Sequence, residues 1–434
     1  MNHRDHTHSE MQDLLEAANS AQSKLDAAMI FLKDKQIHNL MLREGYPMEA
    51  EKIVDGEVVI SECYPLQKGQ SLSNEIEASE MYFSRLPDGR MVDGMINRAD
   101  LKAIANRISP DWEKEIRRGA IDGIFFGEDE TRFRANVFLW GGNTGETSDG
   151  ITGRLGCMIR VIPKEIPALE TLALPPYMRS LADANYGLLL VVGPTGGGKT
   201  TTTASYIDYI NHHRAGHIVK IEDPIEFVHR EDKCRISARE IGTNVESFET
   251  GVRDAMRELP TAIAVGEIRN QETLFHTIRA GASGHYVTAT RHAPSLVSGI
   301  RALVDDLPGD TSANAVMVAE TLLGVIFQVC VPGIDGNWHF VHEVMNVTNN
   351  ERAKEYIAAQ KWPSLRDLLT TPASTGDNRL AKSLNEGLAS LVVDKKVTRL
   401  AAERKAYDRT GLAREIGSLN NVNSANKAKK EQVA

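Results

Sequence analysis

The stretch GPTGGGKT, from Gly193 to Thr200, lies between the apolar run Leu188–Val192 and the helix-like run Thr201–Ile210. A strand leading in and a helix leading out are the setting that a phosphate-binding loop requires. Its glycines let the backbone curl until N–H groups point at phosphate oxygens, and the start of the next helix adds positive charge. The alternative is a glycine-rich turn followed by Lys-Thr by chance. The flanking elements favour a nucleoside triphosphate site.

Two side chains of this loop have separate expected roles. Lys199 places a cation near the β and γ phosphates, and the hydroxyl of Thr200 is offered to Mg²⁺. ATP and Mg²⁺ are therefore the predicted ligands. The residues predicted to hold the nucleotide here are Gly193, Pro194, Thr195, Gly196, Gly197, Gly198, Lys199, Thr200 and Thr201.

The composition of the whole chain limits its class. At 434 residues, with 41% hydrophobic and 25% charged side chains, the chain predicts two or three globular domains. A net charge of −9 gives no global attraction to nucleic acid or to an anionic membrane, and we expect neither as a direct partner. No apolar run is long enough to span a membrane, and the polar start MNHRDHTHSE does not resemble a signal peptide. We expect a cytoplasmic protein.

The cysteines give no sign of a disulfide framework or a zinc site. Cys63, Cys157, Cys234 and Cys330 are far apart in the sequence and never form a C-x-x-C pair. Buried, reduced thiols are the expectation.

The pattern along the chain divides it into parts. Residues 1–32 have apolar positions at helical spacing and predict a helical extension. Residues 33–162 mix short β-like runs with turn signals, which indicates an α+β domain. Residues 163–176 contain four prolines and predict a linker or hinge. Residues 351–416 predict a helical part, and 417–434, rich in Asn, Ser, Ala and Lys, a disordered tail.

Between the hinge and the helical part, residues 177–350 alternate strands with helices. The predicted strands are Leu188–Val192, Ile218–Ile221, Ile263–Val265 and Tyr286–Thr290. This alternation predicts a parallel sheet covered by helices, with ligands bound at the carboxyl ends of the strands. The fold class is therefore α/β.

Acidic residues follow two of these strands. Glu222, Asp223 and Glu226 come after Ile218–Ile221, and Glu267 follows Ile263–Val265. Hydrolysis of a nucleotide requires carboxylates that support Mg²⁺ and orient water. Solvated loop acids are the alternative for either set alone, but two sets at strand ends of one sheet favour function.

Two histidines, His285 and His292, flank the strand Tyr286–Thr290. A histidine at this place is able to sense the γ-phosphate or to hydrogen-bond the acidic residues, and a structural role fits the spacing equally well.

Taken together and in order, the motifs resemble the ATPases of type II and type IV secretion systems and type IV pili. GPTGGGKT, IEDPIEF, AVGEIRNQET and GHYVTATRHA match the Walker A, Asp box, Walker B and His box of that family. The similarity covers roughly residues 35 to 415. The resemblance implies a homo-hexameric ring whose subunits join an N-terminal PAS-like domain to a C-terminal RecA-like P-loop NTPase domain. It also implies work on inner-membrane secretion or pilus assembly proteins from the cytoplasmic side.

The resemblance also assigns roles to residues of this sequence. Glu222 matches the Asp-box glutamate that acts on the attacking water, and Glu267 matches the Walker B glutamate that supports Mg²⁺ through water. Which of the two orients the water stays open. His285 and His292 match the His-box pair, of which we take His292 as catalytic.

Arginines complete the site that the resemblance implies. Arg132, Arg134 and Arg160 lie in stretches that resemble the family's phosphate-facing arginines, and Arg253 and Arg257 match its helix before Walker B. A guanidinium that reaches a γ-phosphate is a common device in nucleotide hydrolysis. A surface salt bridge is the alternative for each, and we take Arg257 as the catalytic candidate.

The sequence departs from the family pattern at four places. They are Leu259-Pro260-Thr261 before Walker B, Asn270 after its arginine, Thr290-Arg291-His292-Ala293 in the His box and Asn39-Leu40-Met41-Leu42 in the N-terminal domain. These departures bear on the subfamily rather than on ATP binding.

Two alternatives concern what the protein does. The scattered cysteines leave no room for the zinc insertion of assembly and export ATPases, so the chain looks nearest the branch of retraction, Dot-type and plasmid-conjugation ATPases. The predicted function is to hydrolyse ATP and power a type IV secretion, conjugation or pilus machine. A nucleotide-gated ring scaffold with little turnover is the alternative, and a nucleic-acid motor is disfavoured by the acidic charge.

Overall fold

The computed structural model describes residues 37–46, 48–63, 96–127, 130–141, 150–370 and 380–433, which form two compact units. The first unit ends at Lys164 and also takes in the turn Ile334–Asn337, and the second comprises Glu165–Gly333 and the chain from Trp338 on. The break after Lys164 falls inside the segment 163–176 that carries the four prolines. The helix predicted over residues 1–32 lies outside the described residues.

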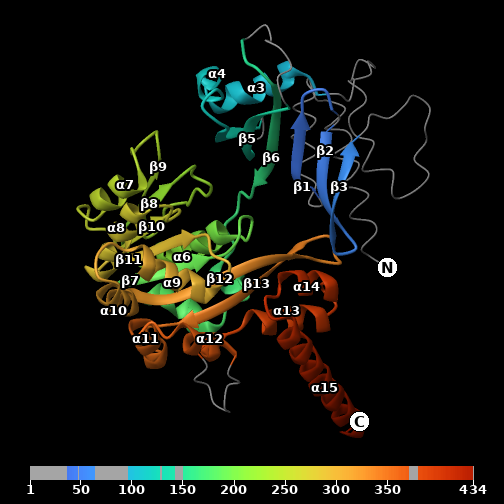
Figure 1. Cartoon of the computed structure of the whole chain (residues 1–434), viewed down its shortest axis with the longest axis vertical. Helices are drawn as coiled ribbons and strands as arrows, with labels where there is room; N and C mark the ends of the chain where they lie inside the picture. The colour runs from blue at the N-terminus through green and yellow to red at the C-terminus, as the bar shows by residue number, and fades with distance from the viewer. Residues whose placement is uncertain are drawn as a thin grey trace, which may run out of the picture. The chain divides into compact units, whose positions relative to one another are not determined.

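The first unit contains a six-stranded antiparallel sheet in the order β3-β2-β1-β6-β5-β4. Helices α3 and α4 accompany it, and α3 contacts β4, β5 and β6 (Figure 1). Its elements are β1 (Ile37–Arg43), β2 (Met48–Val54), β3 (Glu57–Cys63), α3 (Arg98–Ile108), α4 (Trp112–Glu115), β4 (Ile121–Phe126), β5 (Arg132–Trp140) and β6 (Arg154–Ile162).

Alternation along β5 explains how this sheet packs. Phe133, Ala135 and Val137 are fully buried in the core of the unit, so Arg132 and Arg134 lie on the opposite face of the strand. The degraded N-terminal signature lies in β1, where Leu40 and Leu42 belong to the same core.

The second unit contains an eight-stranded sheet in the order β14-β13-β12-β7-β11-β10-β8-β9. The strands from β12 to β9 in this order are parallel, and β13 and β14 are added antiparallel. Its elements up to the last parallel strand are η2 (Leu169–Thr171), α5 (Pro176–Arg179), η3 (Ser180–Asp183), β7 (Gly187–Val192), α6 (Lys199–His213), β8 (Gly216–Glu222), β9 (Cys234–Glu240), α7 (Phe248–Ala255), β10 (Ala262–Val265), α8 (Gln271–Ala282), β11 (Tyr286–Arg291), α9 (Leu296–Asp306), α10 (Thr311–Thr321) and β12 (Leu322–Pro332).

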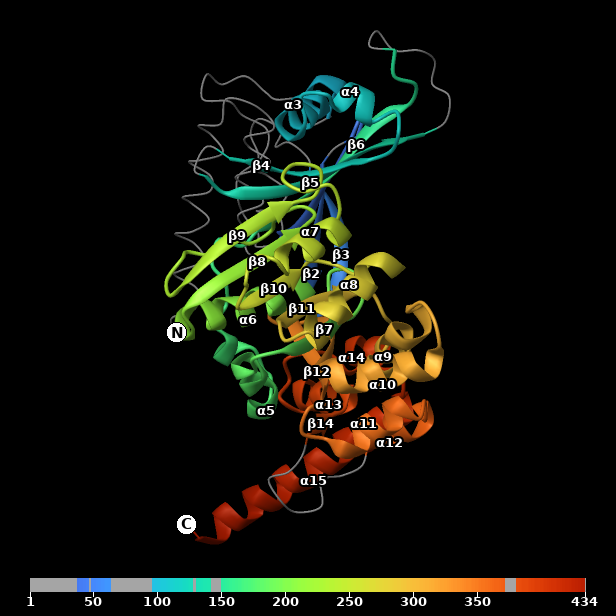
Figure 2. The same cartoon turned by 90° about the vertical axis from the view of Figure 1, so that its left-hand side faces the viewer.

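Helices cover both faces of this sheet (Figure 2). Leu188, Leu190 and Val192 of β7 pack into a cluster with α7 to α10, and Leu189 and Val191 pack into a second cluster with α6. Because both faces are buried, the strand reads as an unbroken apolar run. All four strands predicted in this region are present, as β7, β8, β10 and β11.

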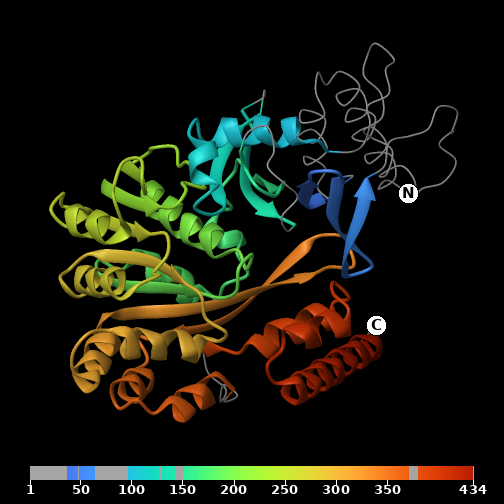
Figure 3. The same ribbon diagram turned by 45° about the horizontal axis from the view of Figure 1, so that its top comes forward.

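The end of the chain is mainly helical, and the long β12–β13 pair lies before it (Figure 3). The remaining elements are β13 (Trp338–Asn346), α11 (Glu351–Ala358), α12 (Trp362–Thr370), β14 (Ala381–Lys382), α13 (Leu384–Val393), α14 (Arg399–Lys405) and α15 (Arg409–Val433). The structure differs from the disordered tail predicted for 417–434, because α15 continues through Val433. The Ala and Lys in that segment favour a helix, and α15 packs against α13.

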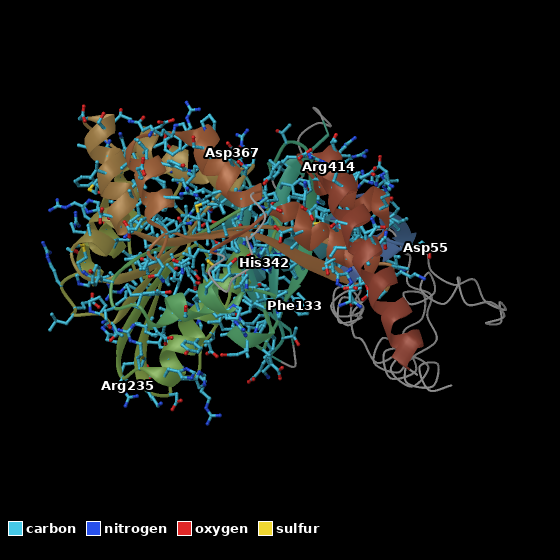
Figure 4. All side chains as sticks on the ribbon, turned by 90° about the horizontal axis from the view of Figure 1, so that it is seen from below. Asp55, Phe133, Arg235, His342, Asp367 and Arg414 are labelled. Atoms are coloured by element: carbon cyan, nitrogen blue, oxygen red, sulfur yellow. The ribbon has the colours of Figure 1, made fainter. Side chains whose placement is uncertain are left out.

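Burial separates the interior of the second unit from its surface (Figure 4). His342 of β13 lies inside and is 4% exposed, whereas Arg235 and Asp367 lie at the surface. Of the described helices, none combines the length and the apolar character that crossing a membrane requires.

Candidate nucleotide site

The phosphate loop connects β7 to α6 as the sequence predicts. Gly193, Gly196 and Gly198 have φ values of 153°, 73° and 80°, a region that side-chain-bearing residues rarely adopt. Gly198 is the N-cap of α6, and Lys199 is its first helical residue. The N–H groups at the start of α6 therefore lie at the end of the loop, where they favour an anion.

The ammonium of Lys199 lies inside the curl of the loop. It donates to the carbonyl oxygens of Gly193 and Pro194, at 3.1 and 2.9 Å, and lies 3.4 Å from Nδ1 of His292. Burial lowers the pKa of Lys199, and the carboxylates of Glu267 and Glu226 act in the opposite direction. Two predicted acidic residues thus lie within electrostatic reach of this charge.

His292 connects the phosphate loop to the predicted Walker B glutamate. Its Nε2 lies 3.0 Å from Oε1 of Glu267, and its Nδ1 faces Lys199. An ammonium has no lone pair to offer, so Nδ1 must accept and Nε2 must donate in this arrangement. Lys199, His292 and Glu267 therefore form one continuous chain of polar contacts.

Arg269 extends these polar contacts from Glu267 to the Asp box. Nε of Arg269 donates to Oε2 of Glu267 at 2.6 Å, and its NH1 donates to Oδ2 of Asp223 at 2.9 Å. The backbone allows this contact because Gly266 has no side chain: a Cβ there would lie 3.0 Å from the carbonyl oxygen of Ile221. The ends of β8 and β10 are thereby held together, as their parallel pairing predicts.

Glu222, the other predicted catalytic glutamate, is held differently. Its Oε2 lies 3.0 Å from Nζ of Lys220, which is 2% exposed and also donates to the carbonyl of Phe227 at 2.7 Å. Glu222 ends β8 beside Asp223, so it lies at the same edge of the sheet as Glu267. Its carboxylate is partly neutralised by a buried lysine, whereas that of Glu267 faces His292 and Arg269.

Two predicted candidates are not brought to the phosphate loop within the chain. His285 lies before β11 and approaches Ser283 and the carbonyl of Ala280, at the amino edge of the sheet. Arg257 follows α7, and its exposed side chain lies 3.8 Å from Asp254. Helix α7 packs on the face of the sheet opposite α6. The chain after α7 returns to the amino edge of the sheet, where the backbone N–H of Thr261 donates to the carbonyl of His217.

Arg253, which lies within α7, also pairs with Asp254, at 3.6 Å.

The three N-terminal arginines belong to the first unit. Arg132 and Arg134 share one face of β5, and Arg160 is the cross-strand partner of Arg134 on β6. Arg134 donates to both carboxylate oxygens of Asp122. These residues gather on one face of the N-terminal sheet, as alternation along the strands requires.

Two departures from the family pattern have a structural reason. Asn270 is the N-cap of α8 and accepts from the N–H of Thr273 at 2.8 Å, a role that Asn fills as well as Asp. Arg291 pairs with Asp306 at the end of α9. Nothing in the structure explains Leu259, which is 89% exposed at a φ of 52°.

The residues at this edge fit a nucleotide with Mg²⁺. The positive φ values of Gly196 and Gly198 bend the loop so that successive backbone N–H groups can converge on an anion. Thr200, in the first turn of α6, and Glu267 supply the oxygen ligands that Mg²⁺ prefers, with water completing its shell.

Two contributors, Arg269 and Gln328, were absent from the predicted site. Arg269 and Asp223 close the contact to the Asp box, and Gln328 of β12 packs under the loop. Asp223 stands among the predicted strand-end acids, but its arginine partner is 46 residues away. Gln328 had no signal, because its place depends on the pairing of β12 with β7.

The chain is similar to known proteins and to solved structures. The family described as "Type II/IV secretion system protein" matches residues 167–361. The chain is 31% identical over 355 residues to a twitching motility protein of Neisseria gonorrhoeae, covering 81% of this chain and 87% of that protein. It is 32% identical to a type IV pilus retraction ATPase, PilT, of Pseudomonas aeruginosa, covering 76% of this chain and 94% of that protein.

A crystal structure of the pilus retraction motor PilT with bound ADP has a similar fold. It superposes with a TM-score of 0.67 at 27% identity, covering 91% of this chain and 100% of that one. The ordered motifs, the contacts among them and similarity along nearly the whole length of two relatives agree with one another. This chain belongs to the type II/IV secretion system protein family, the family of secretion and type IV pilus ATPases.

Proposed function

We propose that this protein is a Mg²⁺-dependent ATP hydrolase that acts as a hexameric ring and powers a type IV pilus, secretion or conjugation machine. It works from the cytoplasm on inner-membrane components of that machine. The observation that carries the proposal is the unbroken contact from Lys199 through His292 to Glu267, at the carboxyl edge of a parallel sheet. The similarity along most of the length of a twitching motility protein and of a type IV pilus retraction ATPase supports the retraction branch.

In the proposed reaction each residue has a defined task. The loop N–H groups and Lys199 bind the phosphates, and the hydroxyl of Thr200 would hold Mg²⁺. A magnesium ion at Thr200 supplies charge that balances the transferring phosphoryl group. Glu267, oriented by Arg269 and His292, supports the ion through water or orients the attacking water, and Glu222 is the alternative for that second task.

The division of the chain fits a motor of two domains. In this proposal residues 33–162 form the PAS-like domain, 177–350 the RecA-like ATPase domain and 163–176 the hinge between them. The break between compact units after Lys164 supports this division. The arginines Arg132, Arg134 and Arg160 would serve the nucleotide from the first domain, a role that the family resemblance alone supports.

The experiment that tests the function compares ATP turnover of four proteins. We expect Mg²⁺-dependent turnover in the wild type and at least ~10²-fold less in Glu267→Gln, the order of losing a catalytic acid–base group. ATP affinity should change little, because the amide keeps the size of the carboxylate. Glu222→Gln shows whether the second glutamate is also required. Glu272→Gln, an exposed acid in the first turn of α8, is the matched control and should keep full activity.

Each outcome has a clear meaning. Full turnover by Glu267→Gln contradicts the assignment of that residue. Tight ATP binding by the wild type without turnover, in a ring, contradicts hydrolysis and supports the nucleotide-gated scaffold.

A further inference from the structure

Gln328 lies directly under the phosphate loop although it is 130 residues away in the sequence. Strand β12 pairs parallel to β7, with Phe327 opposite Val192, so Gln328 comes just beyond the end of β7 where the loop begins. Its side chain is fully buried. The amide spans two elements: Nε2 donates to the carbonyl of Gly197 in the loop, and Oε1 accepts from the hydroxyl of Thr202 in α6 at 2.7 Å.

The glycines of the loop fit closely against this residue. A Cβ on Gly193 would lie 2.3 Å from the carbonyl oxygen of Gln328, and one on Gly197 would lie 2.9 Å from the same atom. A Cβ on Gly198 would lie 2.9 Å from Nε2 of Gln328. At Gly193 and Gly197 the close atom is a backbone oxygen of β12, so a side chain there would displace that strand, and part of the glycine pattern is required by β12 and not by phosphate alone.

The contact with Gly197 controls the direction of an N–H group. In a trans peptide the C=O and N–H bonds point to opposite sides. Because the carbonyl of Gly197 is held toward Gln328, the N–H of Gly198 in the same peptide plane is directed away from Gln328. Gly198 is the N-cap of α6, directly before Lys199, where a phosphate-binding loop presents N–H groups to its ligand.

We propose that Gln328 is a positioning residue for nucleotide binding, which fixes the Gly197–Gly198 peptide in its phosphate-binding orientation. The proposal rests on the proposed nucleotide-binding function of this loop. Thr202 has a supporting role: its hydroxyl donates to Oε1 and so leaves the NH₂ end of the amide facing Gly197. Gln328 does not touch the reacting atoms, and its effect passes through the loop backbone.

The decisive variant is Gln328→Glu. It keeps the size of the side chain and the acceptor for Thr202, but once ionised, above the carboxyl pKa that burial raises, it places a carboxylate oxygen against the carbonyl of Gly197. We expect the Kd for Mg·ADP and the KM for ATP to rise about tenfold or more, the order of losing one hydrogen bond to a buried group. The kcat at saturating ATP should change by less than about threefold, because the reacting groups are intact.

A pH series separates positioning from simple packing. A protonated carboxyl again donates to the carbonyl of Gly197, so the Mg·ADP affinity of Gln328→Glu should recover as the pH falls. Gln328→Met fills the same space without a donor, and its weakened affinity should not recover. His342 lies opposite Gln328 on β13 and Lys199 follows the loop, so the wild type at each pH is the reference.

A matched control tests whether any buried amide-to-acid change has the same effect. Asn314 is 6% exposed, and its Nδ2 donates to the carbonyl of Leu307 at 3.0 Å in the same unit. Asn314→Asp should leave the Kd for Mg·ADP unchanged even if it lowers the thermal midpoint. If Gln328→Glu does not fold, Thr202→Val provides the test against Thr277→Val, whose hydroxyl bonds within its own helix.

Unchanged Mg·ADP affinity in both Gln328 variants, with a wild type that binds Mg·ADP, would overturn the role of Gln328 alone. In the Thr202 test, equal affinity in Thr202→Val and Thr277→Val would do the same. A wild type that binds neither Mg·ADP nor Mg·ATP would overturn this proposal together with the proposed function.

Discussion

The ammonium of Lys199 is the charge around which the site is built. In the structure it is held by two loop carbonyls and His292, which are contacts that a phosphate group would replace. We expect Lys199→Ala to raise the Kd for Mg·ATP at least ~10²-fold, because a hydrogen bond to a charged group contributes about 3 kcal/mol. Isothermal titration measures this change. Lys233→Ala, an exposed lysine, is the control. Equal affinity in both variants would contradict the role of Lys199.

His292 and His285 make different predictions although they flank the same strand. His292 lies between Lys199 and Glu267, so His292→Ala should lower kcat about tenfold or more, within the range for groups that move or orient protons. His285 approaches the carbonyl of Ala280 at the other edge of the sheet, so His285→Ala should leave kcat unchanged. Steady-state kinetics of the pair checks this. A similar loss of kcat in both variants would contradict the placement of the site.

At the residue scale, the order of the motifs predicts which residues form the site better than it predicts which side chains contact one another. Lys199, Glu267 and His292 were predicted from the sequence and lie in contact. Arg269 and Gln328 were not assigned roles, because their partners depend on which strands are neighbours and in which register. The surface salt bridge of Arg257 with Asp254 is the alternative that the sequence left open, since the face on which α7 packs is a tertiary property.

At the scale of the element, strand β13 contains a buried histidine that should govern stability in acid. Burial lowers the pKa of His342 to about 4, and Lys382 acts in the same direction. The unfolded chain has a histidine pKa of about 6.5. It therefore binds the proton first as the pH falls, and the stability that the neutral His342 contributes is lost between about pH 6.5 and 4.

We expect this loss to amount to about 3 kcal/mol over that range, at 1.36 kcal/mol for each pKa unit. His342→Gln should remove it, and His339→Gln, on the same strand but only half-buried, should not. Urea unfolding of the three proteins at pH 7 and pH 4 measures the difference. An equal pH dependence in wild type and His342→Gln would contradict the burial of a neutral histidine.

Four of the six parallel strands in the eight-stranded sheet were predicted from the sequence. These four, β7, β8, β10 and β11, are largely apolar because both of their faces are buried. The apolar run of β12 was not predicted as a strand. Edge strand β9, with the half-polar sequence CRISARE, was missed. So was the helical state of the tail in α15, where Asn and Ser obscured the helix-forming Ala and Lys.

At the scale of the whole molecule, Arg257 provides a test of the ring. Within one chain it lies on the face of the sheet opposite α6, so an arginine finger from this residue has to act on a neighbouring subunit. Arg257→Ala should bind ATP without turnover. Subunits of Lys199→Ala should not bind ATP, but they still supply Arg257. A mixture of Arg257→Ala and Lys199→Ala should therefore recover part of the turnover.

The mixing test has a matched control and a clear negative result. Arg235→Ala, an exposed arginine on the edge strand β9, should turn over ATP normally on its own. If the mixture of Arg257→Ala and Lys199→Ala stays as inactive as either variant alone, Arg257 does not act between subunits.

The measurement that tests the central claim most directly is Mg²⁺-dependent ATP turnover of the full chain, recorded with particle mass across a range of protein concentrations. The proposed motor predicts turnover that rises as particles of six subunits form and that is lost in Glu267→Gln at the same mass. Six-subunit particles that bind ATP tightly without hydrolysing it would contradict a motor. Full turnover by a monomer would contradict the ring.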